Sequence, residues 1–154
     1  MKPFGTRRRS GNAMIEFAIS SAVLIPCMAG TFQFGFSTYQ YNLLECAVSN
    51  GARYASTRTF RTLSGAADLD KFKAAVRNMT VYGVPAGGAT PVAKGLTPAR
   101  IAVDVTLSSG LPTYVKVSLI NHQVDAVFTT FNFNGKPAVT YPYVGRYAPN
   151  ESEP

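Results

Sequence analysis

The stretch that decides the fold runs from Asn12 to Phe36 and reads NAMIEFAISSAVLIPCMAGTFQFGF. From Phe17 to Phe36 it carries no charged side chain, and about 20 such residues in a helix cross the hydrocarbon core of a bilayer. We therefore expect one transmembrane helix with residues 14–36 in the membrane. Small and polar residues within the stretch allow close helix–helix approach, so it also predicts lateral association: Ser20, Ser21, Gly30, Thr31, Gln33 and Gly35.

A basic leader, residues 1–11, precedes the apolar stretch and contains Lys2, Arg7, Arg8 and Arg9. The positive-inside rule predicts a cytoplasmic N-terminus, with everything after the helix on the other side of the membrane. These four residues carry part of the net charge of +7, because the rest of the chain has 15 − 4 = 11 basic and 8 acidic residues, or +3. The remaining basic residues are scattered, so we expect no nucleic-acid partner.

Three interpretations of the N-terminal segment are open. It is a secretory signal cleaved near Ala29, an uncleaved signal anchor, or a leader cleaved on the cytoplasmic side just before the helix. Glu16 discriminates between these interpretations, because a carboxylate near mid-bilayer costs about 2.5–3.5 kcal/mol. A secretory signal or a simple anchor gains nothing from that carboxylate. The structural alternative is an interfacial Glu16 beside the positive end of the helix dipole.

Two motifs carry a family resemblance. Gly11, four further residues and then Glu16-Phe17 before an apolar run resemble the processing motif of type IV pilin-like proteins. The sequence NGARYA at residues 50–55 resembles the end of the N-terminal helix in TadE/TadG-like proteins of the tight-adherence (Tad/Flp) pilus system. Together the two motifs cover residues 7–56, roughly a third of the chain, and the first is the more specific.

The resemblance implies that a prepilin peptidase cuts after Gly11 and leaves Asn12 as the mature N-terminus, although a small apolar residue is more usual there. It implies that Glu16, followed by Phe17, serves processing or assembly by attracting the N-terminal amine of a neighbouring subunit. The implied partners are membrane lipid, the peptidase and other pilins or pilus assembly proteins, copies of this chain included. The implied place is the bacterial inner membrane or the pilus.

The length of the chain argues against a short major Flp pilin. The expected function is that of a minor pilin or pseudopilin in pilus assembly, with helix-mediated subunit packing and surface adhesion. The alternative function, from a different functional class, is that of a monomeric, signal-anchored periplasmic binding or scaffold domain.

Beyond the membrane we expect the same helix to continue, over residues 12–57 in all, with a kink at Pro26 or an interruption at Gly51. Its inward face is predicted from three- and four-residue steps as Tyr39, Leu43, Cys46, Ala47, Tyr54 and Ala55. Five aromatic residues are candidates for a belt at the outer leaflet, with core packing as the alternative: Phe32, Phe34, Phe36, Tyr39 and Tyr41.

We expect residues 58–148 to form an extracytoplasmic α+β domain, in which a small antiparallel sheet packs against the long helix. We expect residues 149–154 to form a flexible tail. A second helix is expected over 66–82, a loop over 85–98, and strands over 100–107 and 114–120. Residues 124–133 are a third strand or an irregular apolar segment. Asn134-Gly135 predicts a hairpin into a last strand, 137–147, which Pro142 marks as an edge or broken strand.

No arrangement of nucleophile, base and orienting group emerges, so we expect no enzyme and no cofactor. His122 is the single histidine; we predict a surface residue and no metal site, since metals need several convergent ligands. Cys27 and Cys46 are predicted as buried packing residues. On one helix they would lie about 28 Å apart, too far for an intrachain disulfide.

Overall fold

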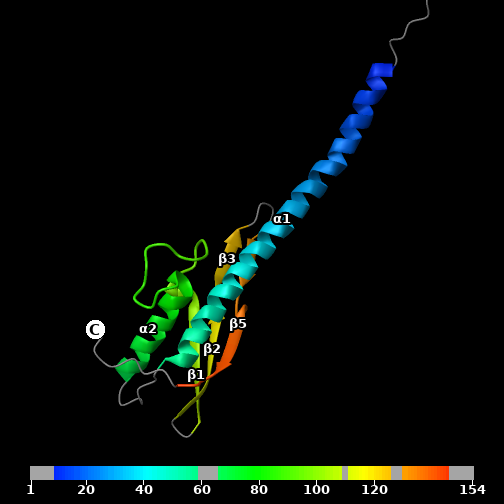
Figure 1. The fold of residues 1–154 in the computed structure, drawn as a ribbon. Helices are drawn as coiled ribbons and strands as arrows, with labels where there is room; N and C mark the ends of the chain where they lie inside the picture. Colours follow the sequence, from blue (N-terminus) through cyan, green and yellow to red (C-terminus); the bar gives the residue numbers. More distant parts are fainter. Residues whose placement is uncertain (1–8, 59–65, 109–110, 126–129, 146–154) are drawn as a thin grey trace, which may run out of the picture.

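A computed structural model describes residues 9–58, 66–108, 111–125 and 130–145. Figure 1 shows a long helix, α1 (Arg9–Thr57), that projects well beyond a small domain. The domain adds helix α2 (Ala66–Tyr82), the short 3-10 helix η1 (Pro98–Arg100) and five strands. The chain is therefore α+β, as predicted. The leader's residues 1–8 and the predicted tail at 149–154 lie outside the described residues, as do residues 59–65, 109–110, 126–129 and 146–148.

Helix α1 is continuous. Pro26 cannot donate to the carbonyl of Ala22, yet the helix continues through it and through Gly51, so neither position interrupts it as the sequence suggested. The helix begins at Arg9, before the predicted Asn12, and ends at the predicted Thr57. Thus one rigid element runs from the apolar stretch into the domain.

The docked half of α1 buries a stripe of mostly small side chains: Leu44, Ala47, Val48, Gly51, Ala52 and Ala55. The predicted stripe was right for Ala47 and Ala55 and wrong for Tyr39 and Cys46, which are exposed. Large aromatic side chains on this helix remain near the surface because α2 and the sheet approach closely where the helix is Ala- and Gly-rich. The buried face is thus decided by close packing.

A three-stranded antiparallel sheet, in the order β1-β2-β5, supports the helices. Its strands are β1 (Ile101–Ser108), β2 (Leu111–Leu119) and β5 (Ala138–Pro142). Alternate residues face the helices and form the core with α1 and α2, and paired positions such as Val103↔Val117 lie side by side. The predictions for β1 and β2 are confirmed, and Pro142 does end an edge strand.

The remaining strands, β3 (His122–Asp125) and β4 (Thr130–Phe133), pair with each other in a separate two-stranded sheet. The predicted hairpin across Asn134-Gly135 is therefore wrong. Gly135 does adopt the left-handed conformation, with φ 76°, but its amide donates to the Leu119 carbonyl at 2.7 Å and the chain returns to β2. The last strand also ends at Pro142, short of the predicted Tyr147.

The segment after β5 caps the end of α1. The amides of Val144 and Gly145 donate to the Ser56 carbonyl at 3.0 and 3.3 Å, and the Tyr143 hydroxyl donates to the Arg58 carbonyl. Carbonyls at a helix C-terminus lack partners within the helix, so these bonds satisfy them. The long helix is thereby fixed to the far end of the sheet.

Candidate assembly helix

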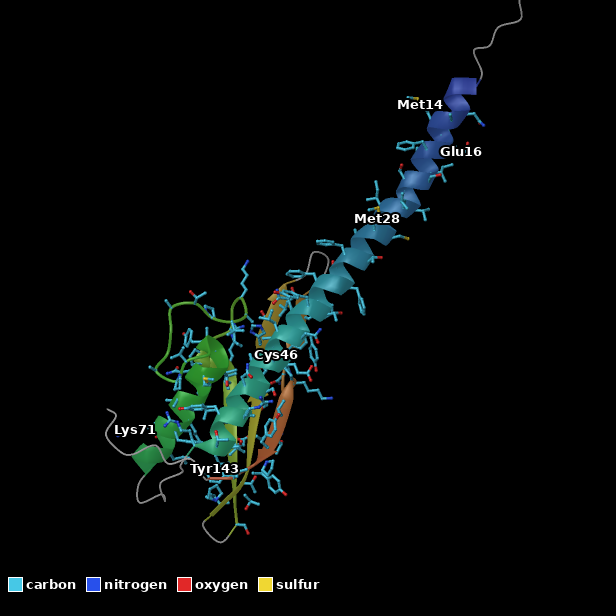
Figure 2. All side chains as sticks on the ribbon, in the orientation of Figure 1. Met14, Glu16, Met28, Cys46, Lys71 and Tyr143 are labelled. Atoms are coloured by element: carbon cyan, nitrogen blue, oxygen red, sulfur yellow. The ribbon has the colours of Figure 1, made fainter. Side chains whose placement is uncertain are left out.

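None of the other described residues surrounds the first half of α1. Figure 2 shows the side chains of Met14, Glu16 and Met28 projecting from a helix that nothing else surrounds. The segment is long and apolar enough to cross a membrane, and 0% of its 18-residue apolar window is buried. Large side chains such as Phe17, 74% exposed, and Ile25, 65% exposed, would be costly to leave in water.

All four residues predicted to serve processing or assembly lie on this bare segment. Gly11, Asn12, Glu16 and Phe17 are exposed, and a Cβ added at Gly11 would meet nothing within 4 Å. The helix continues through the Gly11–Asn12 bond. Asn12 and Glu16 are four residues apart, so they share one face of the helix.

Glu16 lies on a face of α1 where polar residues recur, with apolar Val23 between Ser20 and Cys27. Glu16, Ser20, Cys27 and Thr31 follow one another at steps of four, seven and four, which place them on one face of α1. All four are exposed, and the Thr31 hydroxyl donates to the Cys27 carbonyl at 2.9 Å. We call these four residues the polar stripe. Ser20 and Thr31 were predicted to allow close helix–helix approach, Glu16 to serve assembly and Cys27 to be a packing residue; the spacing that relates the four was the signal for the stripe.

The two cysteines do not pack in the interior. Cys27 and Cys46 are both exposed and unpaired, which corrects the prediction that they are buried and confirms that they form no intrachain disulfide. Nineteen residues separate them, so Cys46 lies roughly 100° around the helix from Cys27 and off the polar stripe.

The residues of the NGARYA motif lie at the other end of α1, where the helix meets the domain. A Cβ added at Gly51 would come within 1.9 Å of the Thr80 Oγ1 atom, so only glycine permits this approach of α1 to α2. On the neighbouring face, hydrogen bonds first from Ser49 and then from Arg53 lower the pKa of Tyr141 on β5. These contacts tie α1 to both α2 and the sheet edge.

His122 is buried, with 1% of its surface exposed, which corrects the prediction of a surface residue. Arg100 Nη1 lies 3.2 Å from His122 Nδ1. Because a guanidinium can only donate, Nδ1 accepts and the proton sits on Nε2, which has no partner among the described residues. Burial, and secondarily the charge of Arg100, lower the pKa of His122. No group of three or more His, Cys, Asp or Glu within the described ranges could hold a metal.

The family model of TadE-like proteins matches residues 11–53. The N-terminal helix of this chain is TadE-like. The match confirms the resemblance drawn from the two motifs, and it runs from the predicted cleavage site to the contact of Arg53 with the sheet edge. No curated protein and no solved structure matches the chain significantly. The TadE-like match and the apolar helix together indicate a protein related to the Tad pilus system, with a helix suited to a membrane anchor.

Proposed function

We propose that this TadE-like protein is a minor pilin or pseudopilin of a Tad/Flp-type pilus, anchored in the bacterial inner membrane with its α+β domain outside. A prepilin peptidase removes residues 1–11, and the bare half of α1 then packs among the helices of other subunits. The domain contributes to surface adhesion. The protein works without a cofactor and without enzymatic activity.

One observation carries the proposal: the TadE-like match covers a helix whose apolar half is bare and has a carboxylate at its start. In lipid, polar side chains on one face of a helix gain by hydrogen bonding to another helix. Glu16 and the polar stripe therefore support a helix that associates laterally, with Glu16 pairing with the new amine of a neighbour and setting the register.

The rival function is that of a monomeric, signal-anchored scaffold domain in the periplasm. Mass spectrometry of the protein extracted from membranes separates the two. An N-terminus at Asn12 supports the pilin proposal, whereas a start near Gly30 indicates secretory cleavage and an intact Met1 an unprocessed anchor. Either of the last two outcomes would overturn the proposed processing.

Glu16→Ala tests the role of the carboxylate. We expect normal membrane insertion, because removing a charge favours a membrane helix, but impaired incorporation into pili. Glu16→Gln is the matched variant that keeps the shape and removes the charge, and it should fail in the same way. Normal piliation in both variants contradicts the role assigned to Glu16.

A further inference from the structure

The domain begins to cover α1 within the apolar stretch. Gln33 is only 9% exposed, although Phe32 and Phe34 beside it are 75% and 76% exposed. From Gln33 the covered face continues through Ser37, Gln40 and Tyr41 to Leu44, at steps that keep to one side of the helix. The domain therefore overlaps the last part of the segment that would lie in the membrane.

The length of α1 that precedes Gln33 sets the distance between the domain and the outer surface of the membrane. From Asn12 to Phe32 the helix rises about 30 Å, which matches the thickness of the hydrocarbon core. If Glu16 marks the inner boundary instead, the outer boundary moves along the helix to about Phe36. With the boundary at Phe32, Gln33 lies in the interfacial layer, which adds about 5–7 Å on each side; with the boundary at Phe36, it lies about 4.5 Å inside the hydrocarbon core. In both cases the covered face of α1 begins at or below the membrane surface.

The β3–β4 hairpin is the part of the domain that points this way. In Figure 1, β3 runs along α1 toward its apolar half. The ring of Phe133 lies 5.8 Å from that of Tyr41 on α1. Phe131, two residues nearer the apolar half, lies about 7 Å further along the strand and is 39% exposed. This places Phe131 near the level of Phe36.

Building on the proposed membrane anchoring, we propose that the β3–β4 hairpin rests in the lipid headgroup layer through Phe131, beside the aromatic side chains of α1. Phe34, Phe36 and Tyr39 are exposed on the helix at this height. The amphipathic ring of Tyr39 favours the membrane–water interface, and the phenylalanine rings at this height bury their apolar surface at the boundary between headgroups and acyl chains. The helix and the hairpin thus make two contacts with the bilayer, and the second limits how far the whole molecule can tilt in the membrane.

The chain contains no tryptophan, so a single introduced tryptophan reports its own surroundings. We would reconstitute the full-length Phe131→Trp variant in phosphatidylcholine–phosphatidylglycerol vesicles, with and without brominated acyl chains that quench tryptophan on contact. Leu24→Trp, in the middle of the apolar half, reports insertion of the helix. Tyr114→Trp, 48% exposed on β2 toward the far end of the sheet, is the matched control on the domain.

We expect the brominated lipid to quench Leu24→Trp and Phe131→Trp, with a blue-shifted emission for both, and to leave Tyr114→Trp unchanged. Quenching of Leu24→Trp alone would overturn the inference while the anchor stands. A blue shift of Phe131→Trp without quenching would also overturn it, in favour of a protein partner at the hairpin. No quenching of Leu24→Trp would instead contradict the membrane anchor itself.

Circular dichroism checks that Phe131→Trp has folded. Should it not fold, Asn132→Trp replaces it, because Asn132 is an exposed neighbour on the same strand. Its quenching would support the inference and its full exposure to water would contradict it.

Discussion

At the scale of single residues, two buried positions, His122 and Gly51, make contacts that one substitution can test. His122 sits at the start of β3, buried, with Arg100 donating to one ring nitrogen. Gly51 lies where α1 and α2 touch, with no room for a Cβ. Each has an effect that a measurement of stability can isolate, because the chain has only one histidine and offers glycines in open space as controls.

His122 makes stability depend on pH. Burial and Arg100 lower its pKa in the folded state below the ordinary value of about 6.5 that it has when unfolded. Below about pH 6.5 the unfolded chain therefore binds a proton that the folded chain does not, so the free energy of unfolding falls as the pH falls through that value. Urea unfolding of the detergent-solubilised protein between pH 8 and 5 measures this. His122→Gln should flatten the profile, and an unchanged profile contradicts the assignment.

Gly51→Ala should destabilise the domain by about 1–3 kcal/mol, because the new methyl group would overlap the Thr80 hydroxyl. Thr80 is fully buried and bonded to the Val76 carbonyl at 2.8 Å, so it cannot simply rotate away. Gly35→Ala, in open space on the same helix, is the control and should leave unfolding unchanged. Adding Thr80→Ala to Gly51→Ala should recover part of the loss; strictly additive losses would rule out this contact as the cause.

At the scale of elements, α1 is one helix with two different surroundings. Its first half presents an apolar surface with the polar stripe on one face, and its second half is packed against α2 and β5. Because the helix is unbroken between the two halves, the orientation of the polar stripe is fixed relative to the domain. Subunits that pack through this stripe would therefore also hold their domains in a defined arrangement.

Cys27 allows this packing to be tested with the chain's own cysteines. In a Cys46→Ser variant the single remaining cysteine lies on the polar stripe, and mild oxidation in membranes should give a disulfide-linked dimer if copies of the chain pack through it. The matched Cys27→Ser variant keeps only Cys46, off the stripe, and should cross-link less. Non-reducing electrophoresis gives the fraction of disulfide-linked dimer for each variant. Equal fractions, or a larger fraction for Cys27→Ser, would contradict packing through the polar stripe.

At the scale of the whole molecule, the core and the bare helix are separable. Gln33 is the one buried residue that the structure describes in the apolar half of α1. The core residues of α1 begin at Leu44, and the remaining described core residues lie after α1. Among the described residues the apolar half thus adds nothing to the core, which leaves its surface for the proposed membrane attachment and subunit packing. A fragment beginning at Ser37 keeps the whole core stripe of α1.

We expect the fragment 37–154 to be soluble without detergent and to unfold cooperatively in urea. The fragment 47–154 is the matched comparison, since it lacks Leu44, whose loss from a core costs about 2–5 kcal/mol. It should be less stable by at least that amount or fail to fold. Aggregation of 37–154 despite its intact core stripe would show that the bare half is needed for folding.

The sequence by itself determined the elements whose signal is local. The apolar stretch to Phe36, helix α2 with its stop at Gly83, and the alternation of β1 and β2 could all be read from neighbouring residues. The TadE-like resemblance of the N-terminal helix was also readable, because each of its two motifs is a short run of neighbouring residues.

Only the tertiary structure decided which faces and edges meet. The burial of His122 depends on η1, 22 residues earlier in the chain, and the pairing of β4 with β3 overrides the Asn134-Gly135 turn signal. The inward stripe of α1 follows from the closeness of Thr80 to Gly51, which no periodicity within the helix encodes. Local patterns record how one segment alternates between apolar and polar residues, whereas these outcomes depend on the shape of surfaces brought together from distant parts of the chain.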